Sequence, residues 1–81
     1  MRISTVVKES LDRYANDHLA TGGFLRAVLA NDLAGAVGRA DLDNTFALVD
    51  IVRYIWNQLP SECHGSYEAV DRWLAKENRA A

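Results

Sequence analysis

The longest regular pattern of apolar residues lies in the second half of the chain, over residues 44–59. Apolar side chains recur there every three or four positions, which is the period of one face of an α-helix. They are Leu48, Ile51, Val52, Ile55 and Leu59. A second stripe beside the first consists of Phe46, Val49, Arg53 and Trp56. An apolar surface this wide exceeds what a helix buries against one neighbour. We therefore predict a central helix with packing partners on two sides.

The ends of this helix are also marked. Asp43 or Asn44 is predicted to cap its start, because a side-chain oxygen there can accept a hydrogen bond from a free backbone N–H group. Pro60 cannot continue the helix and disfavours helical geometry at Leu59. The β-branched residues in the stretch would suit a strand, but about four turns between a cap and a proline favour a helix.

The preceding stretch, residues 23–40, continues the helical spacing but contains an interruption. Asn31 and Asp32 favour caps and turns, because their side chains compete for backbone groups. Gly35 and Gly38 each weaken a helix by about 1 kcal/mol. Either one helix or two short helices fit this pattern, and we favour a bend or break near Asn31.

Shorter helices flank these two. Ser4 or Thr5 is placed to cap a first helix that ends between residues 17 and 20, Thr21 to cap the next, and Ser66 to cap the last. The predicted buried positions of the first and last helices are Val7, Leu11, Tyr14, Tyr67, Val70, Trp73 and Leu74. The sequence thus predicts an all-α fold, a compact bundle of four to five short helices around the helix at about 44–59, in a single domain over residues 1–81.

Length and charge restrict the function. A chain of 81 residues buries a modest core, and short helical chains often gain stability by self-association, so a homo-oligomer is expected. A net charge of −2 disfavours a dedicated nucleic-acid binder. Most of the nine cations are arginines, which suit bidentate contacts with carboxylates or phosphates.

The sequence predicts a cytoplasmic location. Cys63 is the single cysteine, so no intramolecular disulfide can form. The first residues lack the apolar region of a signal peptide, and no apolar run is long enough to cross a membrane.

The residues with catalytic or metal-binding chemistry are few. His18, Cys63 and His64 are the only soft metal ligands, and the adjacent pair Cys63–His64 has poor spacing for a zinc site. A Cys/His nucleophilic pair would require His18 to reach the thiol across the fold. We therefore predict no metal, no cofactor and no catalytic residue, and hence a protein that is not an enzyme.

Two further motifs have simple structural interpretations. Asp41, Asp43 and Asn44 resemble part of a calcium loop, but the glycine and the distant glutamate of an EF-hand are absent, so helix capping explains them better. Gly22–Gly23 precedes a predicted helix but lacks the Lys-Ser or Lys-Thr of a phosphate-binding loop.

Polar and aromatic residues gather at the predicted break and on the central helix, and together they form the candidate binding site. They are Arg26, Asn31, Asp32, Arg39, Arg53, Tyr54 and Trp56. Such residues suit a shallow pocket or a protein-binding surface. Structural ion pairs, such as Asp32 with Arg39 or Asp50 with Arg53, are the simpler interpretation. A DNA-binding helix-turn-helix is disfavoured, because the second helix is too apolar to read bases.

Several segments also resemble a family of small uncharacterised phage and prophage proteins. They are GGFLRAVLANDL (22–33), GRAD with Asn44 (38–44), IVRYIWNQLP (51–60), and CHGS (63–66) followed by Trp73-Leu74. The resemblance covers about residues 11–74. His64 departs from it, because an aromatic residue is expected at that position. The resemblance implies a phage accessory protein, and many such proteins act against host defences.

Three hypotheses for function follow. The first is a small non-enzymatic phage accessory protein that binds and inhibits a host protein, such as an antiphage defence component, in the cytoplasm of the bacterial host. The second is an oligomeric binder of a nucleotide signal, in which Arg26, Arg39 or Arg53 holds phosphates and Trp56 or Tyr54 stacks on the base. The third is a regulatory helper with weak nucleic-acid contact.

Overall fold

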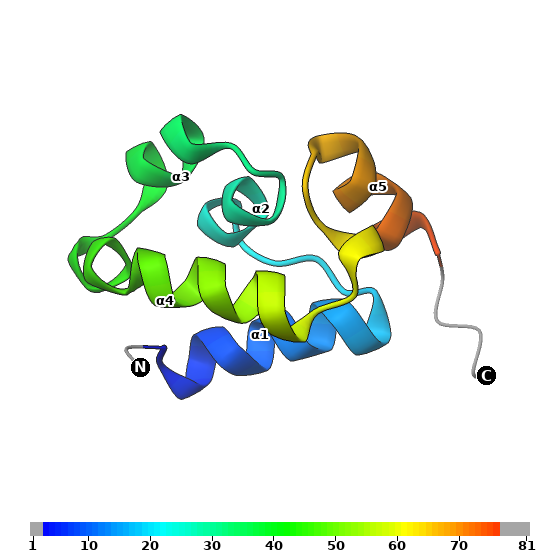
Figure 1. The fold of residues 1–81 in the computed structure, drawn as a ribbon, viewed down its shortest axis with the longest axis horizontal. Helices are drawn as coiled ribbons and strands as arrows, with labels where there is room; N and C mark the ends of the chain where they lie inside the picture. The colour runs from blue at the N-terminus through cyan, green and yellow to red at the C-terminus, as the bar shows by residue number, and fades with distance from the viewer. Residues whose placement is uncertain (1–2, 77–81) are drawn as a thin grey trace.

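The structure, a computed structural model, describes residues 3–76, and this part of the chain is helical with no strand (Figure 1). Its elements are α1 (Thr5–Asp17), α2 (Gly23–Leu29), α3 (Leu33–Arg39), α4 (Leu42–Gln58), the short 3₁₀ turn η1 (Ser61–Cys63) and α5 (Tyr67–Ala75). The prediction of a small all-α bundle is confirmed.

The core lies between α4 and the helices on one side of it. Helix α1 runs beside α4, and Tyr54 of α4 donates a hydrogen bond of 2.5 Å to the Asp12 carboxylate of α1 (Figure 1). Helices α2 and α3 pack on each other and lie over α4 (Figure 1), and α5 packs against α2 and η1. The largest fully buried side chains come from α1, α2, α4, η1 and α5; they are Leu11, Tyr14, Leu29, Ile51, Ile55, Cys63 and Val70.

Helix α4 begins two residues before the predicted start. Its N-cap is Asp41, whose carboxylate accepts a hydrogen bond of 2.8 Å from the Asn44 N–H. The prediction of Asp43 or Asn44 as the cap was therefore wrong. The backbone of Asp41 is extended, the conformation that a cap requires, whereas Asp43 and Asn44 already lie inside the helix.

Helix α4 has packing partners on two sides, as predicted: Tyr54 reaches α1, and Leu48 and Val52 face α2 and α3. The second stripe, however, does not provide either contact. Ile51 and Ile55 are fully buried, but the second stripe faces outward: Val49 is 61% exposed and Trp56 is 55% exposed. Successive residues of a helix are about 100° apart, so this stripe lies opposite the buried one. The described helices therefore meet α4 around Ile51 and Ile55, between Tyr54 and Val52, and leave the second stripe exposed.

The predicted break near Asn31 is confirmed and has a specific backbone structure. Asn31 has a φ of 61°, in the left-handed region that asparagine tolerates better than most residues. The N–H of Asn31 bonds the Val28 carbonyl, and the N–H of Asp32 bonds the Ala27 carbonyl. This pair of bonds is the Schellman motif, which ends α2. Asp32 then caps α3 by accepting a hydrogen bond of 2.9 Å from Gly35.

The remaining caps were predicted with mixed success. Ser4 caps α1 and Ser66 caps α5, each accepting a hydrogen bond from the N–H three residues further on. Helix α1 ends at Asp17, within the predicted range. The Thr21 cap was wrong, because the Thr21 hydroxyl donates to the Gly22 carbonyl and Gly22 itself is the N-cap of α2.

Tyr14 connects α1 to the C-terminal part of the fold. Its buried hydroxyl donates a hydrogen bond of 2.7 Å to the Cys63 carbonyl in η1. Its own carbonyl accepts a hydrogen bond of 2.8 Å from the indole N–H of Trp73 in α5. His18, just after α1, lies against the Trp73 ring with the ring centroids 4.5 Å apart. Helices α1 and α5 are therefore held together by polar bonds inside the apolar core.

We predict that Tyr14→Phe lowers the free energy of unfolding by about 1–2 kcal/mol, because the buried Cys63 carbonyl loses its donor. Urea denaturation followed by circular dichroism measures the change. A variant as stable as the wild type would show that this bond does not contribute to the fold.

The glycines of α3 provide a matched pair of substitutions. A Cβ at Gly38 would meet nothing within 4 Å, so Gly38→Ala should raise the free energy of unfolding by about 0.5–1 kcal/mol through helix propensity alone. A Cβ at Gly35 would overlap the Asp32 carboxylate that caps the helix. Gly35→Ala should therefore lose that gain or destabilise the protein. Equal thermal stabilisation by both substitutions would contradict the position of Asp32.

Candidate functional site

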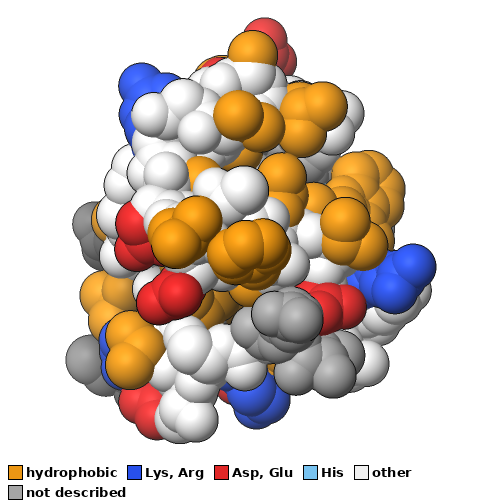
Figure 2. Space-filling view, turned by 90° about the vertical axis from the view of Figure 1, so that its left-hand side faces the viewer, with side chains coloured by type: hydrophobic (Ala, Val, Ile, Leu, Met, Phe, Trp, Pro, Cys, Tyr) orange, Lys and Arg blue, Asp and Glu red, His pale blue; other side chains and the backbone are white. Residues whose placement is uncertain are grey.

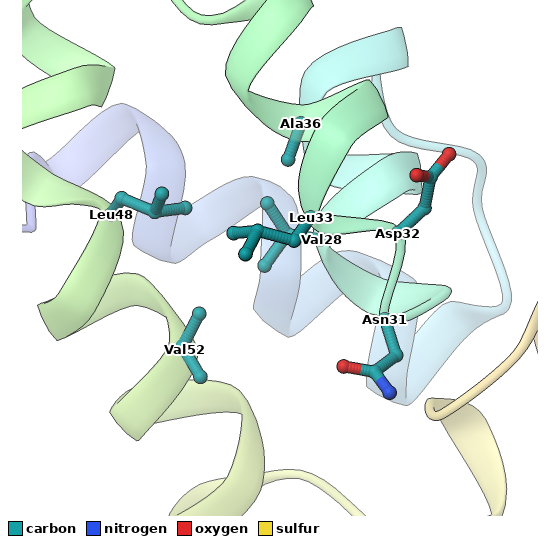
Figure 3. A pocket seen from close by; sticks show the side chains of 7 residues that line it. All are labelled: Val28, Asn31, Asp32, Leu33, Ala36, Leu48 and Val52. Carbon is teal, nitrogen blue, oxygen red and sulfur yellow. The ribbon is translucent and has the colours of Figure 1, made fainter.

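A small cleft lies between α3 and α4 (Figure 3). Its volume is about 40 Å³. Five apolar side chains and two polar residues line it: Val28, Leu33, Ala36, Leu48, Val52, Asn31 and Asp32. In the close-up, Leu33 and Val28 point from the α2–α3 side toward Leu48 and Val52 of α4. The cleft is therefore apolar inside, with Asn31 and Asp32 at the turn on its edge.

The outer surface of α3 extends this apolar area. Leu33 is 67% exposed and Val37, one helical turn further on, is 57% exposed, whereas Ala36 is the buried residue of the helix. We call Leu33, Val37 and the cleft the α3 surface. Figure 2 views the end of the molecule formed by α3 and the start of α4, and hydrophobic side chains spread over the upper and middle part of this face.

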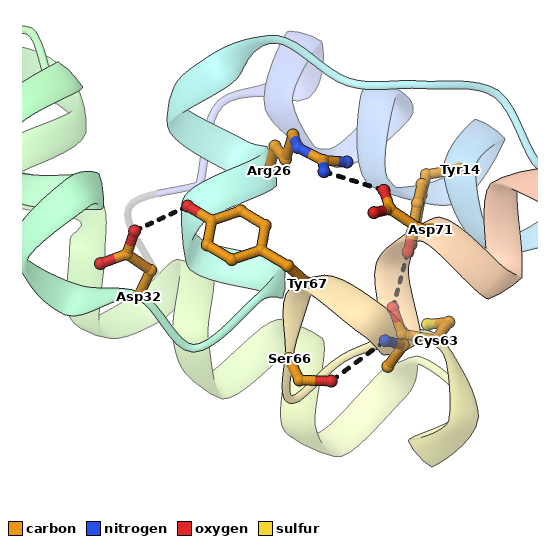
Figure 4. A network of polar contacts seen from close by, with 8 residues as sticks. Tyr14, Arg26, Asp32, Cys63, Ser66, Tyr67 and Asp71 are labelled. Carbon is orange, nitrogen blue, oxygen red and sulfur yellow. Dashed lines mark hydrogen bonds and ion pairs between the residues drawn. The ribbon is translucent and has the colours of Figure 1, made fainter.

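A polar cluster lies next to the α3 surface and connects it to α5 (Figure 4). The Tyr67 hydroxyl donates a hydrogen bond of 2.6 Å to the Asp32 carboxylate. The Arg26 guanidinium forms an ion pair of 2.8 Å with Asp71 and lies 5.2 Å from the centre of the Tyr67 ring. The prediction that Tyr67 is buried was wrong, because its ring lies across this surface and is 39% exposed.

The charges of this cluster reinforce one another. The Tyr67 hydrogen bond, with help from the Gly35 N–H, holds the pKa of Asp32 below its usual value. The same bond raises the pKa of Tyr67. Arg39 lies close enough to lower the Asp32 pKa further, but its guanidinium donates to the Gly35 carbonyl at 3.2 Å rather than forming the predicted ion pair with Asp32. Asp32 therefore remains ionised at neutral pH.

The candidate residues of α4 lie away from the cleft: Arg53 and Trp56 share the exposed face of the helix, and Tyr54 lies on another. Tyr54 points toward Asp12 of α1. Arg53 forms the predicted ion pair with Asp50, at 4.0 Å, with the Arg53 side chain 69% exposed. Trp56 packs its ring against His64, with the ring centroids 4.4 Å apart. Of the seven predicted site residues, the structure thus gathers Arg26, Asn31, Asp32 and Arg39 beside the cleft and places the other three apart.

The sequence reasoning missed three residues of this site. Leu33 and Val37 were counted as part of the continuing apolar spacing, and Tyr67 was assigned to the buried face of α5. The available signal was the four-residue spacing of Leu33 and Val37 on a helix whose remaining residues are mostly alanine and glycine. In α3 the face that meets the core carries Ala36, so the larger Leu33 and Val37 remain exposed.

A second groove lies between the starts of α1 and α4. Its volume is about 280 Å³, and it is lined by Ser4, Val6, Val7, Asp41, Asp43, Asn44 and Ala47. Two of the lining residues are carboxylates, so the groove carries negative charge.

The side chains considered above as metal ligands or as a nucleophile, His18, Cys63 and His64, are part of the packing of the fold. Among residues 3–76, no group of three or more His, Cys, Asp or Glu side chains is placed to hold a metal ion. The Cys63 side chain is buried, which raises the pKa of its thiol to about 11 and suppresses the reactive thiolate. The His18 ring makes a hydrogen bond of 2.8 Å with the Trp73 carbonyl instead of reaching the thiol.

His64 is buried beneath Trp56 and is only 6% exposed. Neither ring nitrogen makes a well-formed hydrogen bond. Burial disfavours the charged ring and lowers the pKa of His64, which the nearby Leu59 backbone offsets in part.

Comparisons with family models, curated proteins and solved structures gave no match. The resemblance to small phage proteins therefore stays a prediction. No described helix combines the length and apolar character that crossing a membrane requires.

The lowered pKa of His64 predicts a pH dependence of stability. The ring titrates near pH 6.5 in the unfolded chain and at a lower pH in the folded one, so the unfolded chain binds more protons between these values. The free energy of unfolding should therefore decrease as the pH falls below about 6.5. His64→Phe should remove this component, because phenylalanine keeps the ring in the apolar site without a titratable group.

Urea denaturation of the wild type and the variant at a series of pH values between 7.5 and 5 would measure this difference. Parallel stability curves for the two proteins would contradict the buried, neutral state of His64.

Proposed function

We propose that this protein is a small non-enzymatic phage accessory protein that binds and inhibits a host protein through the α3 surface. The observation that carries the proposal is the exposure of Leu33 and Val37 beside an apolar cleft with a polar edge. Protein-binding surfaces commonly combine an apolar centre with a polar rim, and their binding energy concentrates at a few anchor side chains that fill small pockets.

The size of the cleft supports a protein rather than a nucleotide as the ligand. Pockets for small molecules typically measure about 300–1,000 Å³. The cleft at α3 measures about 40 Å³, enough for part of one apolar side chain. The groove of about 280 Å³ at the starts of α1 and α4 is closer in size, but its Asp41 and Asp43 carboxylates would repel phosphates.

The arrangement of the arginines also disfavours a nucleotide site. Arg26 of α2 is paired with Asp71 of α5, and Arg53 is paired with Asp50 within α4. Arg26 lies on a different helix from Tyr54 and Trp56. Arg53 shares the exposed face of α4 with Trp56, but the Asp50 carboxylate 4.0 Å from it would repel a phosphate there. At a protein interface, by contrast, Asn31 and Asp32 form a polar edge of the apolar centre, with Arg39 close to Asp32, and such charges can select a partner.

Val37→Asp should abolish partner binding, because it places a carboxylate at the apolar centre of the α3 surface. The matched control is Val6→Asp, since Val6 is 75% exposed on α1 and lies outside the α3 surface. Tagged wild type and variants, incubated with lysate of the bacterial host, should show one stoichiometric protein retained by the wild type and Val6→Asp and lost from Val37→Asp.

Retention of the same protein by Val37→Asp would refute the role of the α3 surface. Absence of a partner for the wild type, combined with a shift of its melting temperature by a nucleotide, would favour the nucleotide-binding alternative instead.

A further inference from the structure

The outward stripe of α4 has a regular spacing. Starting at the first residue of the helix, exposed residues follow at alternating steps of four and three positions: Leu42, Phe46, Val49, Arg53 and Trp56. We call these residues the α4 stripe. Alternating steps of four and three are the spacing by which one helix packs along another in a coiled coil. Leu42 is 70% exposed, Val49 61% and Trp56 55%, so the two ends and the middle of the stripe all face outward.

The charges on α4 are distributed unevenly along its length. Asp41 caps the helix, and Asp43 and Asp50 follow within it, whereas Arg53 is its only lysine or arginine. Arg53 lies within the stripe, in the second half of the helix, with its side chain 69% exposed. The start of the helix is therefore acidic, and its basic position, which Asp50 contacts at 4.0 Å within the same helix, lies in the second half.

This distribution is self-complementary when two copies of α4 run antiparallel. Each Arg53 would then lie opposite the acidic first half of the other helix, near Asp43, and the two helix dipoles would oppose favourably. A parallel pair would instead place Arg53 against Arg53 and Asp43 against Asp43, which costs free energy. A two-fold axis perpendicular to the helices generates the antiparallel arrangement from identical chains.

We propose that the α4 stripe is the interface of a homodimer, with a second copy of this chain as its occupant and the two α4 helices antiparallel. The proposal does not rest on the function assigned to the α3 surface, since that surface includes only Leu48 and Val52 of α4, which are not part of the α4 stripe. A dimer would leave both α3 surfaces available, so that one dimer could hold two copies of a host protein.

The length of the stripe sets the expected strength of the dimer. A helix of 17 residues is about 25 Å long, so the contact is a single helix-to-helix seam. Stable interfaces bury about 800 Å² on each partner, which would be about 15% of the 5172 Å² surface of this chain. A single pair of helices is expected to bury less surface area than this. We therefore expect a dissociation constant in the micromolar range, with monomers at nanomolar concentration.

Sedimentation velocity over a range of protein concentrations tests the proposal. The wild type should change from monomer to dimer as its concentration rises through the micromolar range. Val49→Asp, in the middle of the stripe, should remain monomeric at every concentration while keeping its helical circular dichroism. Leu19→Asp is the control, because Leu19 is 51% exposed in the connection between α1 and α2 and should leave the dimer unchanged.

A charge reversal tests the direction of the two helices. Arg53→Glu should weaken the dimer at least tenfold, and combining it with Asp43→Arg should recover most of the lost affinity. Failure of the double variant to recover would exclude the antiparallel arrangement.

A wild type that sediments as a monomer at all concentrations would overturn the proposal, as would a dimer that Val49→Asp leaves intact. A dimer disrupted by Val37→Asp but not by Val49→Asp would place the self-contact on the α3 surface. Loss of dimerisation in Val49→Asp with host-protein capture retained would separate this proposal from the proposed function.

Discussion

The hydrogen bonds made by Tyr14 are the interaction on which the arrangement of the bundle depends. The hydroxyl of Tyr14 reaches the Cys63 carbonyl, and its own backbone carbonyl accepts from Trp73, 59 residues further along the chain. Both bonds are buried, where an unpaired polar group would cost about 1–3 kcal/mol. They bring α1, η1 and α5 into contact on the same side of α4.

This arrangement determines what α4 presents to solvent. Because α1, α2 and α5 all contribute to the core against Ile51 and Ile55, no helix within residues 3–76 covers the opposite face. Leu42, Val49 and Trp56 therefore stay on the surface, and exposed apolar patches of this kind commonly mark sites where another molecule binds. The α3 surface arises in the same way, because the break at Asn31 separates a short helix that buries only Ala36. The α3 surface and the α4 stripe are thus exposed because the core buries other residues of the same two helices.

Local features of the sequence were sufficient to predict the elements. Pro60, Ser4 and Ser66 mark helix ends through effects that act within one turn, and Asn31 ends α2 because it tolerates a left-handed backbone. The buried side of α4 could not be predicted, because both of its stripes are apolar and periodicity does not say which one meets the core. The cap at Asp41 was missed because three capping side chains occur within four residues and backbone geometry decides among them. The contact between Tyr67 and Asp32 spans 35 residues, so only the tertiary fold brings them together.

The central claim is that the second stripe of α4 faces away from the core, and the two tryptophans test it directly. Trp73 is 8% exposed and lies in the core with Tyr14, whereas Trp56 is 55% exposed on the outward stripe. The measurement is acrylamide quenching of fluorescence in the single-tryptophan variants Trp56→Phe and Trp73→Phe at nanomolar concentration. We predict strong quenching of Trp56 and protection of Trp73. Equal protection of the two, or stronger quenching of Trp73, would contradict the account.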